Sequence, residues 1–114
     1  MAEVMEPCLE VRVTASSLDE AERIISEVIA RRLAAAVQII SPMTSVYWWR
    51  NEVHRAEEWL LLMKTTSQHF EALAACVRAL HSYEVPEIIG VPITAGTPDY
   101  LEWIRQETSP ESGE

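Results

Sequence analysis

The run SVYWWRNEV, residues 45–53, constrains the fold more than any other part of this chain, because it places three large aromatic side chains in a row. Successive side chains of a β-strand point to opposite faces of the sheet. In a strand, Trp48 would therefore lie on one face, and Tyr47 and Trp49 would lie on the other. Aromatic rings left bare on a strand promote aggregation. Other parts of the structure must therefore bury both faces of this segment.

Hydrophobic periodicity predicts four strands and three helices. The strands are expected at residues 8–16, 37–50, 53–65 and 87–96, and the helices at residues 17–36, 67–81 and 97–107. Ser17 and Glu20 form a capping box at the start of the first helix. The run Leu60 to Met63 is continuously apolar, as expected of a strand that is covered on both faces.

Proline, glycine and asparagine mark the irregular points of the strands. Pro42 cannot donate to a strand ladder, so it indicates a bulge or an edge strand. Gly90 and Pro92 indicate an edge strand with a bulge for the same reason. Asn51 and Glu52 are the expected tight turn between the two long strands.

The element order β-α-β-β-α-β, followed by a terminal helix, predicts an α+β, ferredoxin-like fold. Right-handed crossovers would give a four-stranded antiparallel sheet with both main helices on one face. The length of 114 residues fits one domain. We expect the domain to span residues 1–107, and residues 108–114 to form a disordered acidic tail.

The central hairpin, from about residue 37 to residue 66, is too long for such a sheet. Each arm of about 13 residues spans about 43 Å, whereas a usual strand has about 5–6 residues. The helices cover one face only, so we expect other copies of the chain to cover the aromatic hairpin. The alternative is that the hairpin folds back on its own sheet. The expected interface residues are Tyr47, Trp48, Trp49, Trp59 and Trp103.

Composition excludes several classes of protein. A net charge of -9 argues against a nucleic-acid binder, because phosphate affinity comes mostly from Lys and Arg. No apolar run is long enough for a transmembrane helix, and the N-terminus does not have the pattern of a signal peptide. The two cysteines are expected to be reduced thiols, which favours a cytoplasmic protein. No catalytic motif is present, so we do not expect an enzyme.

Three residues near the end of the second helix are candidates for a metal site. His81 is the best single ligand for copper or another divalent cation, and Glu84 and Glu87 lie nearby in the sequence. Pro86 would fix the loop that carries the two carboxylates. The alternative is a helix-terminal histidine followed by a solvated acidic loop.

Four residues are candidates for a ligand cleft. Lys64 sits near the end of an apolar strand, where its charge must pair or reach water. With Glu58 and Glu84, it would form an interfacial ionic cluster or hold an anionic ligand. Tyr83 is the fourth candidate, and packing is the alternative role for its ring.

Several motifs in order resemble one family. LAAAVQIISPMTSVYWWRNEV, LLLMKT, HSYEVPEIIGVPI and YLEWI, between about Leu9 and Ile104, resemble the CutA family of divalent-cation tolerance proteins. The resemblance implies a ferredoxin-like homotrimer whose long hairpins interlock. It also implies kinship with the PII signalling proteins, which bind small effectors in clefts between subunits. The implied function is divalent metal ion tolerance, with a metal ion such as copper, or a small ligand, bound in intersubunit clefts.

The sequence departs from the family at the expected metal ligands. In some members a copper site is assigned to one cysteine and two adjacent histidines. Here Val13 and Leu80 stand at the cysteine and first histidine positions, and only His81 remains. The departure favours a second interpretation, in which a PII-like regulatory or structural trimer binds a small effector or partner protein without its own metal site.

Overall fold

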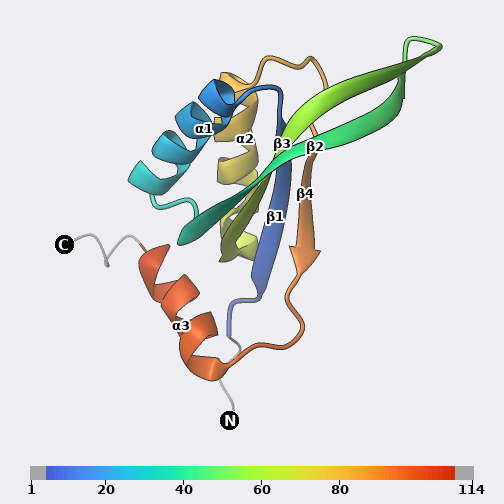
Figure 1. Cartoon of the computed structure of the whole chain (residues 1–114). Coiled ribbons are helices and arrows are strands. Elements are labelled where there is room, and N and C mark those ends of the chain that lie inside the picture. Colours follow the sequence, from blue (N-terminus) through green and yellow to red (C-terminus); the bar gives the residue numbers. More distant parts are fainter. Residues whose placement is uncertain (1–4, 110–114) are drawn as a thin grey trace.

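The computed structural model describes residues 5–109 and contains one sheet of four strands in the order β2-β3-β1-β4. All neighbouring strands are antiparallel. Helices α1 and α2 lie on one face of the sheet, and α3 lies at the end opposite the hairpin tip (Figure 1). This arrangement confirms the predicted ferredoxin-like fold. The elements are β1 (Cys8–Ala15), α1 (Leu18–Ala30), β2 (Ala36–Trp49), β3 (Glu52–Thr66), α2 (Phe70–Leu80), β4 (Ile88–Pro92) and α3 (Pro98–Glu107).

The hydrophobic core lies between the sheet and helices α1 and α2. Alternate residues of the two central strands point into it, and Val11 of β1 pairs with Met63 of β3 at full burial. Removal of each such aliphatic side chain from water stabilises the fold by about 1.5–3 kcal/mol. The helices contribute the fully buried side chains of Ala21, Ile24, Val28, Leu73 and Val77.

Helix α1 begins as predicted but ends earlier. The Ser17 hydroxyl accepts the backbone N–H of Glu20 at 3.0 Å, which confirms the N-cap. At the other end, Arg32 adopts a left-handed φ of 55°, and the N–H of Leu33 donates to the carbonyl of Val28. This is a Schellman ending, so the prediction of helix through residue 36 was wrong. Burial of Leu33 fixes the ending where the sequence has no glycine.

The other two helices begin near their predicted positions. A 3-10 turn over Ser67–His69 precedes α2, and Pro98 occupies the first turn of α3, where its missing N–H costs nothing. Thr108 is buried, and its hydroxyl donates to the carbonyl of Ile104. Residues 110–114 of the predicted acidic tail lie outside the described residues.

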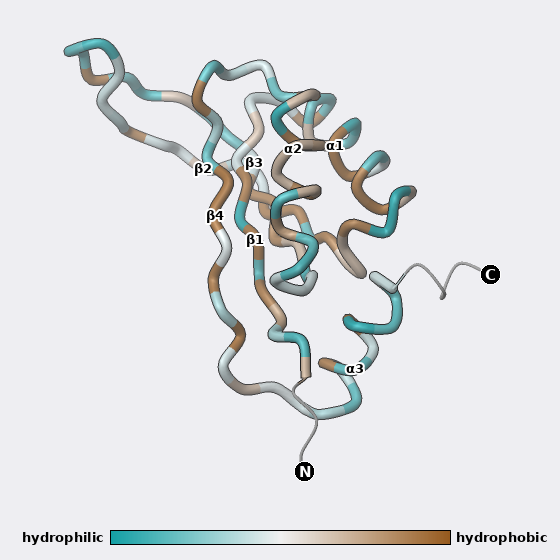
Figure 2. Tube along the Cα trace, turned by 180° about the vertical axis from the view of Figure 1, so that it is seen from behind, coloured by the Kyte–Doolittle hydropathy of each residue, from teal (hydrophilic) through white to brown (hydrophobic). Residues whose placement is uncertain are grey.

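The β2–β3 hairpin extends well beyond the two helices (Figure 1). Seen from behind, its outer part mixes hydrophobic and hydrophilic segments (Figure 2). Trp49 pairs with Glu52, and Arg50 and Asn51 have φ angles of 52° and 67°. Two central residues with positive φ make a type I′ turn, whose twist matches that of the strands. The predicted turn was therefore displaced by one residue, because Glu52 already belongs to β3.

A bulge in β2 confirms the prediction made from Pro42. Ile40 pairs with Leu60, and Met43 pairs with Glu58. Residues 41 and 42 therefore oppose the single residue Trp59. The extra residue changes which side chains of β2 share a face, because facing residues alternate along a strand.

Strand β4 is an edge strand, as predicted, but it contains no bulge. Its register against β1 is regular from Ile88 to Pro92. Gly90 serves packing instead, since a Cβ there would lie 3.4 Å from the ring of Phe70. The prediction of a bulge was therefore wrong, because the glycine provides space below a ring of α2.

Candidate functional site

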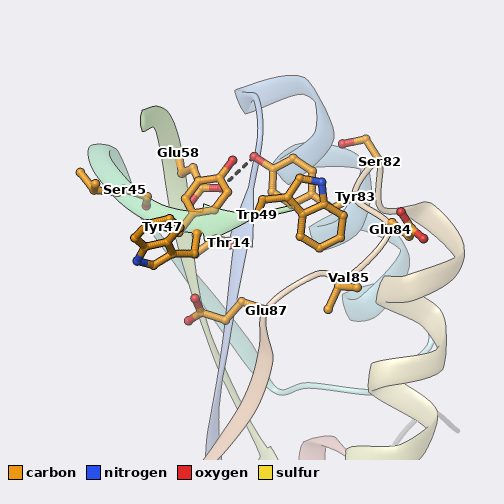
Figure 3. Close-up of a pocket in the computed structure, with 12 residues that line it drawn as sticks. Thr14, Ser45, Tyr47, Trp49, Glu58, Ser82, Tyr83, Glu84, Val85 and Glu87 are labelled. Atoms are coloured by element: carbon orange, nitrogen blue, oxygen red, sulfur yellow. Dashed lines mark hydrogen bonds between the residues drawn. The ribbon is translucent and has the colours of Figure 1, made fainter. Parts of the chain in front are cut away.

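A pocket of about 800 Å³ lies between the outer hairpin and the loop that joins α2 to β4. The hairpin contributes residues 45–49 and Glu58, the loop contributes residues 82–85 and Glu87, and β1 contributes Thr14 (Figure 3). The volume is within the range of small-molecule sites, which is about 300–1,000 Å³. Two segments that are far apart in the sequence therefore form one concave site.

The bulge in β2 determines which hairpin rings face Glu58. Before the bulge, Ile39 pairs with the core residue Leu61. Beyond the bulge, Met43 pairs with Glu58, and Tyr47 shares the face of Met43 because it is four residues further along. Tyr47 and Glu58 therefore lie on the sheet face opposite the helices.

A buried glutamate holds the start of the loop. Glu20 is almost fully buried, and its carboxylate accepts hydrogen bonds from the N–H of Ser16 at 2.8 Å and the N–H of Ser82 at 2.7 Å. Burial alone would raise the pKa of Glu20, but these hydrogen bonds outweigh it and lower the pKa to about 2. The sequence predicts Glu20 only as part of the helix cap, and no local signal predicts its hydrogen bond to Ser82.

His81 ends α2, and both of its ring nitrogens have protein partners. Nε2 lies 2.6 Å from the carbonyl oxygen of Thr14, and the N–H of Tyr83 donates to Nδ1 at 3.0 Å. A carbonyl only accepts and an N–H only donates, so Nε2 carries the proton and Nδ1 carries the lone pair. The side chain is fully buried. In this arrangement neither nitrogen has a lone pair to offer a metal ion.

The structure brings two of the predicted cleft residues into contact. The hydroxyl of Tyr83 donates to Oε2 of Glu58 at 2.7 Å, and Tyr47 points toward the same pair (Figure 3). Burial, followed by the contact with Glu58, raises the pKa of Tyr83. The phenol therefore stays protonated and keeps the buried carboxylate in place.

An ion pair joins the hairpin tip to the loop. Arg50 donates to Glu84 at 2.9 Å, and its guanidinium carbon lies 5.3 Å from the centre of the Trp49 ring. Both charged side chains are exposed. The hairpin therefore reaches the rim of the pocket in its own chain.

Lys64 lies outside the pocket of its own chain, and within residues 5–109 it forms no ion pair with Glu58 or Glu84. Its ammonium lies 3.2 Å from a carboxylate oxygen of Glu10 and donates to the side chain of Gln38 at 3.0 Å. Along β3 it is six residues from Glu58, or about 20 Å. The strand register, which places Lys64 opposite Glu10, explains the difference.

The predicted metal ligands do not form a metal centre within one chain. Glu87 and Glu84 line the pocket, but His81 is turned to the backbone and Glu84 is paired with Arg50. Within residues 5–109, no three His, Cys, Asp or Glu side chains gather where they could hold a metal ion. The donor set of this single chain therefore does not fit copper.

The predicted interface residues differ in exposure. Trp48 is 74% exposed, Tyr47 and Trp49 are about half as exposed, and Trp103 on α3 stacks on Tyr100 at 5.6 Å. Trp59 packs against the hydrophobic core instead. It lies opposite the bulge and on the same face of β3 as the core residue Leu61.

Comparison with known proteins gives one consistent result. The sequence model of the CutA1 divalent ion tolerance protein family matches residues 9–107. The divalent-cation tolerance protein CutA of Thermus thermophilus is 44% identical over 98 residues, which are 86% of this chain and 95% of that protein. The chloroplastic protein CutA 1 of rice, Oryza sativa, is 39% identical over 102 residues, which are 90% of this chain and 58% of that protein.

Solved structures agree with this result. The divalent cation tolerance protein of Thermus thermophilus superimposes with a TM-score of 0.87 at 42% identity, covering 90% of this chain and 99% of that chain. A periplasmic CutA from Archaeoglobus fulgidus gives a TM-score of 0.86 at 36% identity, with the same coverage of both chains. These relatives include a protein named as chloroplastic and one named as periplasmic. No helix within residues 5–109 is long and apolar enough to cross a membrane.

Proposed function

Because the chain belongs to the CutA family of divalent-cation tolerance proteins, we propose that it acts in metal tolerance as a homotrimer with ligand-binding clefts. The observation that carries the proposal is the exposure of large apolar side chains on the outer part of the hairpin, beyond the bulge at residues 41–42. The names of its relatives describe tolerance proteins and no reaction, so we infer a binding role rather than catalysis. The cytoplasmic location expected from two reduced cysteines is part of the same proposal.

Assembly follows from the apolar side chains on both faces of the outer hairpin. Val46 and Val53 are each 57% exposed, and they share one face with Trp48, which pairs with Val53. Tyr47 and Trp49 lie on the other face and are 38% and 37% exposed. Each indole buries roughly 150–250 Å² when it is covered, which corresponds to about 4–6 kcal/mol before the costs of association. Other copies of the chain would bury this surface. That the oligomer is a trimer is inferred from the family resemblance.

Light scattering coupled to size exclusion tests the assembly. We expect the wild type to elute at three times the chain mass of 12.9 kDa, and Trp48→Glu to dissociate. Leu18→Glu is the matched control, because Leu18 is also exposed but lies on α1. A wild-type monomer at micromolar concentration would contradict the proposal.

In this proposal a metal ion binds to the pocket carboxylates Glu84 and Glu87 rather than to His81. Calorimetric titration with copper and zinc should then show saturable binding that Glu87→Gln weakens and His81→Ala leaves unchanged, after correction for folding. Absence of saturable binding tighter than about 100 μM would remove direct metal binding.

A second candidate is a PII-like regulatory trimer that binds a small effector or a partner protein without its own metal site. Both ring nitrogens of His81 are hydrogen-bonded to the backbone, which favours this candidate without a metal site. Native mass spectrometry of the purified oligomer should then reveal a co-purifying small molecule. An oligomer whose mass is accounted for by protein and metal alone would favour the first candidate.

A further inference from the structure

We propose that the pocket between the hairpin and the α2–β4 loop binds an organic cation, carrying an ammonium or guanidinium group. This inference rests on the ligand pocket of the regulatory candidate above and names the chemistry of its ligand. Three observations carry it, namely the sign of the lining charges, a buried carboxylate without a countercharge, and aromatic rings beside both.

All charged side chains that line the pocket are acidic. They are Glu58, Glu84 and Glu87. Glu84 is balanced by Arg50, but Glu87 has no ion pair within residues 5–109. With a net charge of -9 for the chain, the field at this site attracts cations and repels anions.

Glu58 is the second observation, because it is buried without a positive partner. It is only 5% exposed, and it accepts a hydrogen bond from the neutral hydroxyl of Tyr83. Among residues 5–109, no Lys, Arg or His forms an ion pair with it. Burial of an uncompensated carboxylate is costly, so a cation in the adjoining pocket would offset that cost.

Aromatic rings supply the rest of the site. Tyr47, Trp49 and Tyr83 line the pocket beside the carboxylates (Figure 3). The faces of such rings attract ammonium and guanidinium groups at up to about 6 Å. Arg50 already shows the geometry at the rim, where its guanidinium lies over Trp49 and bonds to Glu84. The chain's own side chain therefore occupies part of the surface that an organic cation would use.

An organic cation fits this pocket better than a metal ion. Divalent metals need several oxygen or nitrogen ligands at about 2.0–2.6 Å, and no group of three such residues gathers within residues 5–109. A larger cation instead spreads its contacts over rings and separated carboxylates. The volume of about 800 Å³ also suits an organic molecule rather than a bare ion.

Calorimetric titration with agmatine, which carries a guanidinium and an ammonium group, tests the inference on the purified full chain. We expect saturable binding that Glu87→Gln weakens about threefold to tenfold. Glu71→Gln is the matched control, because it removes the same charge from an exposed position on α2, and it should leave the affinity unchanged. Arg50→Ala should strengthen binding about threefold to tenfold, because it removes the competing guanidinium.

A blocked arginine peptide separates two sources of the same group. Tighter binding of agmatine would support a free small molecule as the ligand, and tighter binding of the peptide would support a basic side chain of a partner protein. Absence of saturable binding of both probes would overturn the inference, as would equal weakening by Glu71→Gln and Glu87→Gln. Light scattering and metal titration on the same preparation test the proposed function separately. A trimer that does not bind agmatine would contradict only the organic-cation inference.

Discussion

The bulge at residues 41–42 divides the β2–β3 hairpin into an inner half, which the helices cover, and an outer half, which is largely exposed. In the inner half, Leu61 and Met63 are fully buried under α1 and α2. In the outer half, Trp48 and Val53 form a cross-strand pair that is largely exposed. Backbone hydrogen bonds therefore suffice to pair the two strands along their whole length. Only the part that helices α1 and α2 cover becomes hydrophobic core.

The two halves stabilise the protein in different ways. The inner half contributes to folding of the single chain, because its cover comes from the same chain. The outer half has apolar residues on both of its faces, and in the proposed trimer it contributes to assembly. Substitutions in the two halves should therefore affect different measurements.

Leu61→Ala should have the largest effect. Leu61 is fully buried in the core, and truncation of a core leucine costs about 2–5 kcal/mol through lost burial and the cavity left behind. The free energy of unfolding, measured by urea denaturation, should fall by that amount. Leu61→Met should cost less than about 1.5 kcal/mol. A loss below about 1 kcal/mol for the alanine variant would mean that the inner half is not the core.

Trp48→Ala should act on assembly alone. A tryptophan at the centre of an interface contributes about 2–4 kcal/mol, so sedimentation equilibrium should show dissociation at higher protein concentrations than in the wild type. Leu18→Ala, an exposed position on α1, is the control and should leave the association unchanged. Unaltered assembly of Trp48→Ala would show that the outer half is covered in some other way.

Glu20→Gln should destabilise the end of the sheet that carries the pocket, by about 1–3 kcal/mol at neutral pH. The pKa of Glu20 is lowered to about 2 in the folded chain. Its stabilisation is therefore fully present above the unfolded pKa of about 4.3 and is lost as the pH falls toward about 2. Urea denaturation between pH 5 and pH 2 should show this loss in the wild type and a flatter profile in the variant. Identical profiles would contradict the assignment.

Asn51→Gly should have the smallest effect, an increase in stability of a few tenths up to about 1 kcal/mol. Asn51 has a φ of 67°, and glycine adopts positive φ without a steric cost. Asn51→Ala should instead cost about 1 kcal/mol. Thermal unfolding of both variants measures the difference. A lower melting temperature for the glycine variant would indicate that the Asn51 side chain holds the tip by contacts beyond the turn.

The order of elements and the sheet topology were predictable because they depend on local patterns. Alternation gave β1, the apolar stripe gave α1 and α2, and Pro42 marked the bulge because a residue without an N–H cannot complete the ladder. The errors arose where packing overrides local signals. Arg32 ends α1 without a glycine, and Gly90 provides space for Phe70 rather than a bulge.

The candidate site was predictable only in part. Glu58 and Tyr83, predicted for a ligand cleft, and Glu84 and Glu87, predicted for a metal site, line one pocket, which the sequence did not predict. The register of β3 separates Lys64 from them, and no local pattern fixes register to one residue. The hydrogen bond from Ser82 to Glu20 was also not predictable from the sequence, because the two residues are 62 positions apart.

The bulge beside Pro42 has a consequence for how the hairpin can vary in length. Deletion of a single residue at positions 41–42 would rotate the whole distal segment by half a turn and exchange the neighbours of Tyr47 and Trp48. Related chains should therefore tolerate changes here only in even steps, or with a compensating change in the opposite strand. Parity, rather than overall length, is the quantity that natural variation must preserve.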